Sequence, residues 1–269
     1  MLPPIVDKKK YNEPSLFLPK NLLREARRQK NIADGAIPEI CILDPDGDIV
    51  RHLLSSGRAA RNPDWPCYHT RLYTFTHKGC DYGIIGYAVG APFAVLVAEE
   101  LFASGCRLLF SVTSAGQITP VAQEPPFFVL IERALRDEGT SYHYLPPSEY
   151  SSMNKDLLVA VQRSLSLPSS HVFFGSSWTT DAPFRETQEA IAYAHSEKII
   201  SVEMESAALY AFSEARLQPV ICIAHVTNQM GVDEGDFEKG EADGHGEVLD
   251  LITNLLQAVR GCLAPPIQP

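Results

Sequence analysis

A regular alternation of short apolar runs and amphipathic stretches through most of the chain is the feature that most constrains the fold. The runs at 40–43, 108–112 and 220–226 have the length of buried strands, and a helical pattern at 92–105 lies between the first two. The stretch 71–90 fits a hairpin of two strands. Because strands alternate with helices, the pattern favours an α/β fold. We predict a three-layer α/β/α single domain with a mixed central sheet.

The domain organisation follows from the absence of internal boundaries. The sequence has no low-complexity linker and no repeat of roughly 20 to 50 residues, and 269 residues suit one large domain. Residues 1–36 are predicted to form an N-terminal arm and a short amphipathic helix, with Asn21 as its candidate N-cap. Residues 37–269 are predicted to form the single domain.

Composition and charge exclude several classes of function. The net charge of −10 argues against a general binder of nucleic acid or of anionic membranes. No apolar run approaches the roughly 20 residues that a spanning helix needs, so we expect a cytoplasmic protein. The six cysteines are scattered, without a C-x-x-C pair or a His/Cys cluster at metal spacing, and we expect no metal site.

Small polar residues are expected where a strand ends. In open α/β sheets, ligands bind beyond the carboxyl ends of the strands. The sequence LFSVTSAGQI places Thr113, Ser114 and Gly116 in such a position, and we expect a turn there. Its backbone N–H groups and hydroxyls suit an anion or a ribose oxygen, although a Ser/Gly turn without a ligand fits the same residues.

Aromatic residues and an arginine surround a second polar segment, GSSWTTDAPFRET. Aromatic faces stack on flat heterocycles, and an arginine reads their edges, so Trp178, Phe184 and Arg185 are candidate base-binding residues. The alternative is a loop pinned by buried aromatic side chains.

Two carboxylates stand one residue apart in the apolar segment SVEMESAALY. The helix dipole stabilises an acid in the first turn by only about 0.3–1 kcal/mol. With apolar neighbours, Glu203 and Glu205 cannot both face solvent, and a buried carboxylate needs hydrogen-bond donors to stay ionised. A vicinal diol supplies two such donors.

These segments, in this order, resemble the nucleoside phosphorylase superfamily over roughly residues 38–262. SVEMESAALY resembles its ribose-binding segment, SVTSAGQI its phosphate turn, and HVTNQ its base-side loop. The resemblance implies a phosphorylase-like fold and a pentosyltransferase that cleaves the N-glycosidic bond of a nucleoside. It further implies that Glu205 accepts hydrogen bonds from the ribose 2′- and 3′-hydroxyls, with Met204 against the sugar and Glu203 in support.

The phosphate-binding residues are only partly kept. The family's Gly-Asp-Pro-x-Arg loop corresponds to 43–47, where the first residue is Leu43 and the last is Gly47. Ser114 is retained, and Arg71 stands at the position of an arginine that reaches into a neighbouring subunit. The resemblance therefore implies a homodimer or homohexamer. We predict phosphorolysis to free base and ribose 1-phosphate, with inorganic phosphate as co-substrate and no cofactor.

Two alternatives stay open. The first is hydrolysis, with Asp44 and Asp46 orienting a water, although Arg51 could instead move into the vacant arginine place and restore phosphate binding. The second is a non-catalytic nucleoside-binding protein. The base is also open: Asn228 stands where purine enzymes carry an acid, and its amide suits an oxo-base.

Overall fold

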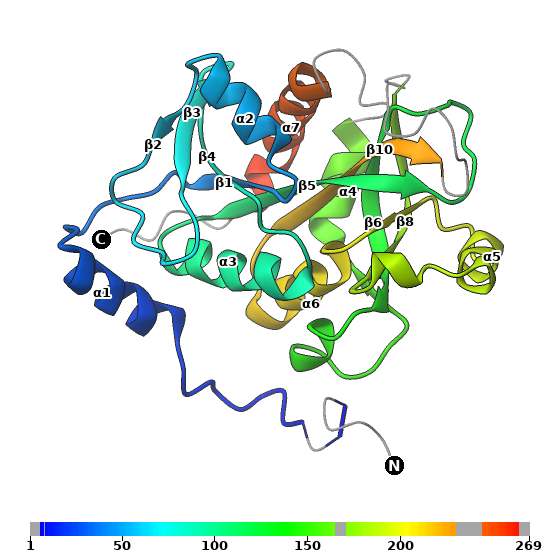
Figure 1. The fold of residues 1–269 in the computed structure, drawn as a ribbon, viewed down its shortest axis with the longest axis horizontal. Coiled ribbons are helices and arrows are strands. Elements are labelled where there is room, and N and C mark those ends of the chain that lie inside the picture. Colours follow the sequence, from blue (N-terminus) through cyan, green and yellow to red (C-terminus); the bar gives the residue numbers. More distant parts are fainter. Residues whose placement is uncertain (1–5, 8, 165–170, 230–243, 264–269) are drawn as a thin grey trace.

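A computed structural model describes residues 6–7, 9–164, 171–229 and 244–263 of the chain (Figure 1). Its helices are α1 (Pro19–Lys30), α2 (Asp48–Ser55), α3 (Ala91–Ala103), α4 (Lys155–Ser164), α5 (Gln188–Ser196), α6 (Ser206–Arg216) and α7 (His245–Val259), with short 3-10 turns at Ser141–His143, Pro183–Arg185 and Arg260–Cys262. Its strands are β1 (Ile40–Asp44), β2 (Ala60–Arg61), β3 (Tyr73–His77), β4 (Cys80–Gly86), β5 (Leu108–Gln117), β6 (Phe127–Asp137), β7 (Tyr150–Ser152), β8 (Val172–Thr180), β9 (Ser201–Glu203) and β10 (Val220–Gln229).

The strands of the described residues form one mixed sheet. Its order is β10-β6-β8-β9-β5-β1-β4-β3-β2, with β7 added to β6. The pairs β1–β4, β1–β5, β5–β10, β6–β8 and β8–β9 are parallel, and the others are antiparallel. The predicted mixed sheet in a single α/β domain is confirmed.

One part of the sheet closes on itself. Strand β10 pairs with β6 and also with β5, so β5, β10, β6, β8 and β9 form a closed ring, and β1, β4, β3 and β2 extend from it as an open wing. The alternation of elements in the sequence does not predict this closure, because it depends on which distant strands meet.

Helices cover the sheet in two groups. Helices α1, α3 and α6 pack in a row on one side, and α2, α7 and α4 pack on the other (Figure 1). Helix α6 is buried along most of its length, from Ser206 to Ser213. Its small residues let it lie close to the strands, and its N-terminus is thereby fixed beside the sheet.

Helix α1 does not begin as predicted. It starts at Pro19, with Leu18 at the N-cap and no side-chain hydrogen bond to the first turn. Asn21 is the third residue of the helix, so its assignment as the N-cap is wrong. A proline with its fixed φ angle is well suited to the first helical positions and sets the start instead.

Candidate active site

The sheet opens on one side of β5. Strand β1 pairs with β5 as far as Ser111, and β9 joins the same side only at Gly116. Residues 112–115 therefore face an opening on that side, while β10 pairs with β5 along its other side. The turn expected at 113–116 is wrong, because this continuous pairing keeps the segment extended.

Glu205 lies beside this opening and is held by three different parts of the chain. It is the N-cap residue of α6, and its side chain is buried. Oε1 accepts a hydrogen bond of 2.6 Å from the amide of Gly90, which precedes α3. Oε2 accepts one of 2.9 Å from the hydroxyl of Thr113 in β5. The structure thus brings the candidate residues Thr113 and Glu205 into contact.

Glu203 has a different set of partners. Its Oε2 accepts hydrogen bonds from the amides of Glu205, at 2.8 Å, and Ser206, at 2.7 Å, and its Oε1 accepts one from the hydroxyl of Thr179 in β8. These amides belong to the first turn of α6, which lacks other partners for them. Glu203 therefore fixes the backbone that carries Glu205.

The two buried acids affect each other's protonation. Burial, followed by the negative charge of Glu203, raises the pKa of Glu205 to about 8, although the Gly90 amide and Thr113 hydroxyl oppose the rise. Burial also raises the pKa of Glu203. Glu205 is therefore expected to change its charge near pH 8.

Asp46 enters the opening from the loop after β1. Its Oδ2 accepts a hydrogen bond of 2.8 Å from the amide of Ser114. The amide of Leu109 donates to Pro219 on the β10 side, so alternation along the strand turns the amide of Ser114 to the opposite, open side. The carboxylate of Asp46 thus accepts the hydrogen bond of the Ser114 amide, for which the break in the sheet leaves no strand partner.

Asp44, in contrast, binds a backbone amide of α2. Its buried carboxylate accepts a hydrogen bond of 2.8 Å from the amide of Val50 in the first turn of α2. Burial raises its pKa to about 7. The expectation that Asp44 and Asp46 both face the nucleophile is corrected, since Asp46 alone of the two binds an amide of the opening.

Taken together, the site holds a buried carboxylate with a raised pKa next to an anion-binding strand amide. The family model described as "Phosphorylase superfamily" matches the sequence over residues 39–259, which is most of the chain. The chain belongs to the phosphorylase superfamily. The resemblance expected from the sequence is confirmed.

Two curated members of the superfamily show how distant this member is. The purine nucleoside phosphorylase DeoD-type of Brevibacillus brevis is 23% identical over 59% of this chain and 68% of its own length. The guanosine phosphorylase of Halorubrum lacusprofundi is 22% identical over 76% of this chain and 87% of its own length.

Solved structures share the fold. Uridine phosphorylase from Vibrio fischeri ES114 matches with a TM-score of 0.68 at 22% identity, covering 84% of this chain and 92% of its own. A second structure of that protein gives the same TM-score at 21% identity and covers 94% and 99%.

The expected base-binding residues of this superfamily member are not brought together. Trp178 is buried in a small cluster with Ile118 and Val202, and its indole N–H donates to Asp137 at 3.0 Å. Phe184 is fully exposed. Arg185 is also exposed, in the same short 3-10 turn as Phe184. The expectation that Trp178 stacks on a base is corrected, because its ring is part of the core.

Asn228, Gly116 and Met204 lie close to the opening. Gly116 is paired with Asn228 of β10 on one side and with Val202 of β9 on the other. Asn228 and Met204 are both half-buried, and the amide of Met204 donates weakly to Glu205 at 3.3 Å. Asn228 comes just after an irregularity in the β5–β10 pairing, which redirects side chains there.

The two predicted arginines lie outside the opening. Arg51 pairs with Asp48 and donates to the carbonyl of Asp46 at 3.3 Å, so it braces the loop from its outer side and does not take the vacant place near Ser114. Arg71 is exposed two residues before the start of β3.

Gly90 and Thr179 are functional neighbours that the sequence reasoning missed. Gly90 has a φ of +89°, a region that L side chains rarely adopt, and this conformation places its amide on Glu205. The sequence signal is a glycine directly before a helix that starts Ala-Pro. Thr179 binds both Glu203 and the amide of Ala207, and nothing in its sequence setting indicates this.

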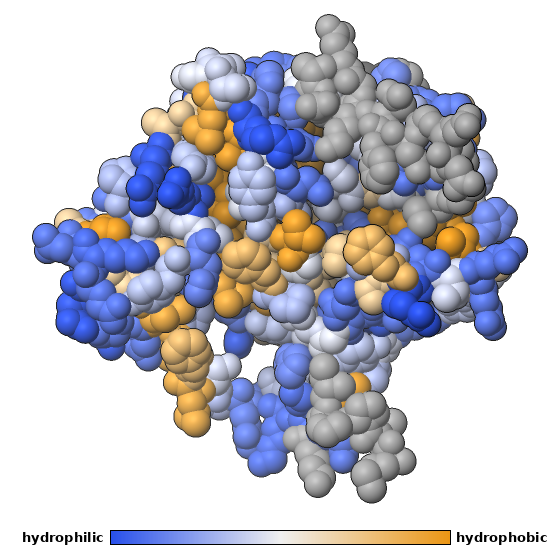
Figure 2. Space-filling model, in the orientation of Figure 1, coloured by the Kyte–Doolittle hydropathy of each residue, from blue (hydrophilic) through white to orange (hydrophobic). Residues whose placement is uncertain are grey.

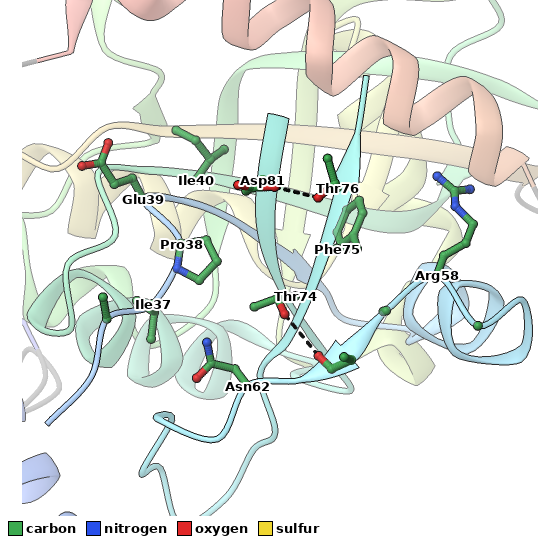
Figure 3. Close-up of a pocket in the computed structure, with 14 residues that line it drawn as sticks. Ile37, Pro38, Glu39, Ile40, Arg58, Asn62, Thr74, Phe75, Thr76 and Asp81 are labelled. Carbon is green, nitrogen blue, oxygen red and sulfur yellow. Dashed lines mark hydrogen bonds between the residues drawn. The ribbon is translucent and has the colours of Figure 1, made fainter. Parts of the chain in front are cut away.

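A groove of about 840 Å³ lies elsewhere, at the N-terminal ends of β1 and β4 (Figure 3). Two of its hydroxyls bond within the groove, Thr76 to Asp81 at 2.6 Å and Thr74 to the carbonyl of Ala60 at 3.4 Å. Arg58 and Glu39 instead contact residues outside it, His77 and Arg107. The described residues contain no group of three or more His, Cys, Asp or Glu placed to hold a metal ion. Within that part of the chain, no helix is long and apolar enough to cross a bilayer.

Proposed function

We propose that this superfamily member cleaves the N-glycosidic bond of a nucleoside by phosphorolysis and releases the free base and ribose 1-phosphate. The observation that carries the proposal is Glu205, a buried carboxylate held at the opening of β5 by Gly90 and Thr113. Membership of the superfamily, and relatives named as purine nucleoside and guanosine phosphorylases, support this activity.

Glu205 would act as the acceptor for the ribose diol. An ionised carboxylate offers about four lone-pair positions, of which Gly90 and Thr113 use two and the amide of Met204 uses a third weakly, at 3.3 Å. The 2′- and 3′-hydroxyls would donate to the remaining position and to the one that Met204 holds weakly. The scissile bond breaks with its electron pair going to the base, which leaves oxocarbenium-like charge on the sugar. Negative charge on Glu205 stabilises that sugar in the transition state.

Other groups would complete the reaction. An oxygen of phosphate forms the new bond to C1′, and the amide of Asn228 donates a hydrogen bond to the departing base. Glu203 keeps the first turn of α6 in place without touching the substrate. Arg71 would supply positive charge to a neighbouring subunit in a homodimer or homohexamer, and we propose a cytoplasmic role in nucleoside salvage.

Hydrolysis is the second candidate, and one observation favours it. The carboxylate of Asp46 occupies the amide of Ser114 and adds negative charge near Glu205. A carboxylate in this place disfavours a phosphate dianion and is able to orient a water molecule.

The deciding experiment is a panel of purine and pyrimidine nucleosides incubated with and without phosphate. Free base and either ribose or ribose 1-phosphate are quantified. The proposal expects phosphate-dependent base release, with ribose 1-phosphate as the sugar product, and a loss of about 10²-fold or more in Glu205→Ala at an unchanged circular dichroism spectrum. Base release that ignores phosphate would support hydrolysis, and saturable binding without base release would refute both reactions.

A further inference from the structure

The loop after β1 supplies a carboxylate to a backbone position that is built for an anion. The Ser114 amide lies in a strand, yet the register of β1 and β9 leaves it without a strand partner on its open side. A buried amide without an acceptor is costly, so such a group is satisfied by whatever acceptor can reach it. Asp46 reaches it at 2.8 Å.

The surroundings show that this position belongs to the reaction site. The residue before Ser114 in β5 is Thr113, whose hydroxyl donates to Glu205. Ser111 lies on the same face of β5 as Thr113, and its buried hydroxyl has no hydrogen-bond partner among the described residues. Residues 111–114 of β5 therefore carry the Ser111 hydroxyl without a partner, the Thr113 hydroxyl that binds Glu205, and the Ser114 amide that binds Asp46.

The loop that carries Asp46 is fixed at both ends. The carbonyl of Asp44 accepts hydrogen bonds from the amides of Gly47 and Tyr87, and the side chain of Asp44 is bound to Val50. Gly47 has a φ of +76° and packs so closely on the ring of Tyr87 that a Cβ would collide with it. Asp46 is thereby presented to Ser114 at a high effective concentration.

We propose that Asp46 is a tethered competitor of phosphate, whose carboxylate must leave the Ser114 amide before a phosphate ion binds there. One N–H group at hydrogen-bond distance serves one strong acceptor, and a carboxylate that stays in place repels a phosphate dianion. Asp46 therefore sets the affinity for the co-substrate. The inference rests on the proposed function, in which phosphate is the nucleophile.

The test is calorimetric titration of inorganic phosphate into the wild-type protein and three variants. Asp46→Ala is expected to bind phosphate about tenfold more tightly or better, as fits the release of one hydrogen bond to a charged group. Asp46→Asn keeps an acceptor of the same shape without the charge, so its affinity should fall between the two. Asp48→Ala is the matched control, because it removes a carboxylate two residues further on, at the start of α2, that pairs with Arg51 instead of Ser114.

Asp48→Ala should stay within about twofold of wild type, since the carboxylate of Asp48 pairs with Arg51 and Asp46 is the one that accepts from the Ser114 amide. The KM for phosphate in nucleoside cleavage should fall by the same factor as the dissociation constant in Asp46→Ala. A phosphate affinity that is unchanged or weaker in both Asp46 variants, with their thermal unfolding intact, would overturn the inference. A base release that is independent of phosphate in wild type and is lost in Asp46→Ala would also overturn it, because Asp46 would then orient a water molecule for hydrolysis.

The two proposals fail separately. If phosphate binds more tightly to Asp46→Ala but no variant releases a base from any nucleoside, the inference about Asp46 holds and the proposed function does not. If bases are released and the phosphate affinity does not change in the Asp46 variants, the proposed function holds and the inference about Asp46 does not.

Discussion

Several opposing effects set the charge of Glu205. Its burial and the nearby Glu203 favour the protonated form, whereas the hydrogen bonds from Gly90 and Thr113 favour the ionised form. Burial raises its pKa to about 8, and the charges of Glu203 and Asp46 act in the same direction. Bound hydroxyls of a substrate would favour the ionised form, as hydrogen bonds to a carboxylate do. Substrate binding and ionisation of Glu205 are therefore expected to support each other.

The first prediction is the pH dependence of catalysis. Because the diol acceptor must be ionised, kcat/KM should rise about tenfold per pH unit below a pH of about 8 and level off above it. Asp46→Ala removes one negative neighbour of Glu205 and should shift the rising limb to lower pH. A limb that comes from ionisation of phosphate would not move in this variant, and a flat profile would contradict the role of Glu205.

The same pKa gives a stability prediction. A carboxyl group with a raised pKa in the folded protein costs stability as pH rises from its unfolded value of 4.5 toward about 8. Glu205→Gln has no such cost, so its thermal midpoint should gain on that of wild type across this window. Melting curves at several pH values measure the thermal midpoint of the variant minus that of wild type, and a difference that stays constant or falls with rising pH would contradict the assignment.

Glu203 allows a matched test of its role in the backbone. Glu203→Ala leaves the amides of Glu205 and Ser206 and the hydroxyl of Thr179 without their acceptor, and we expect it to lower the free energy of unfolding by about 2–4 kcal/mol. Glu189→Ala, in the exposed first turn of α5, is the control and should change it by less than about 0.5 kcal/mol. Equal effects of the two in denaturant titrations would refute the support role of Glu203.

At the scale of elements, the sequence predicts where strands and helices lie better than how they end. The apolar runs locate β1, β5 and β10, and the acid pair correctly marks the junction of β9 and α6. The Thr113–Gly116 segment was expected to turn because its residues are small, but the pairing of β5 with β10 keeps it extended. Tertiary hydrogen bonds overrode the local preference.

The uncapped start of α1 gives a prediction at this scale. Leu18 is partly exposed at the N-cap and binds no amide of the first turn. Leu18→Asp adds such an acceptor and a favourable charge at the helix N-terminus, which we expect to stabilise α1 by about 1 kcal/mol. Hydrogen exchange of the amides of residues 20–22 should slow by several-fold relative to Leu18→Ala, and equal rates in the two variants would contradict it.

The whole molecule explains why parts of the candidate site were not predictable. The closed ring brings Asn228, Gly116 and Val202 side by side from three strands that are distant in the sequence. Trp178, in contrast, is turned into a core cluster by the pairing of β8 with its neighbours. A residue's chemistry can be read locally, but the direction of its side chain depends on strand partners that a single sequence does not specify.

Apolar side chains are exposed next to the segment that holds Glu205. Tyr87 and Val89 are half exposed, although they lie within three residues of Gly90, which binds Glu205. Figure 2 shows further apolar residues across the middle of this face, at the level of α3. Apolar side chains at the edge of a site are suited to burial against another subunit.

The last prediction therefore concerns sites shared between subunits. Arg71→Ala and Glu205→Ala should each be inactive alone, since one lacks the crossing arginine and the other the diol acceptor. Co-expression in equal amounts would make half of the dimers mixed, and each mixed dimer has one intact site. The isolated mixture should then recover about a quarter of wild-type activity. Glu203 and Glu205 belong to the same site of one subunit, so co-expressed Glu203→Ala and Glu205→Ala should give no more activity than the average of the two variants alone. An Arg71→Ala and Glu205→Ala mixture that also fails to exceed that average would show that Arg71 does not cross between subunits.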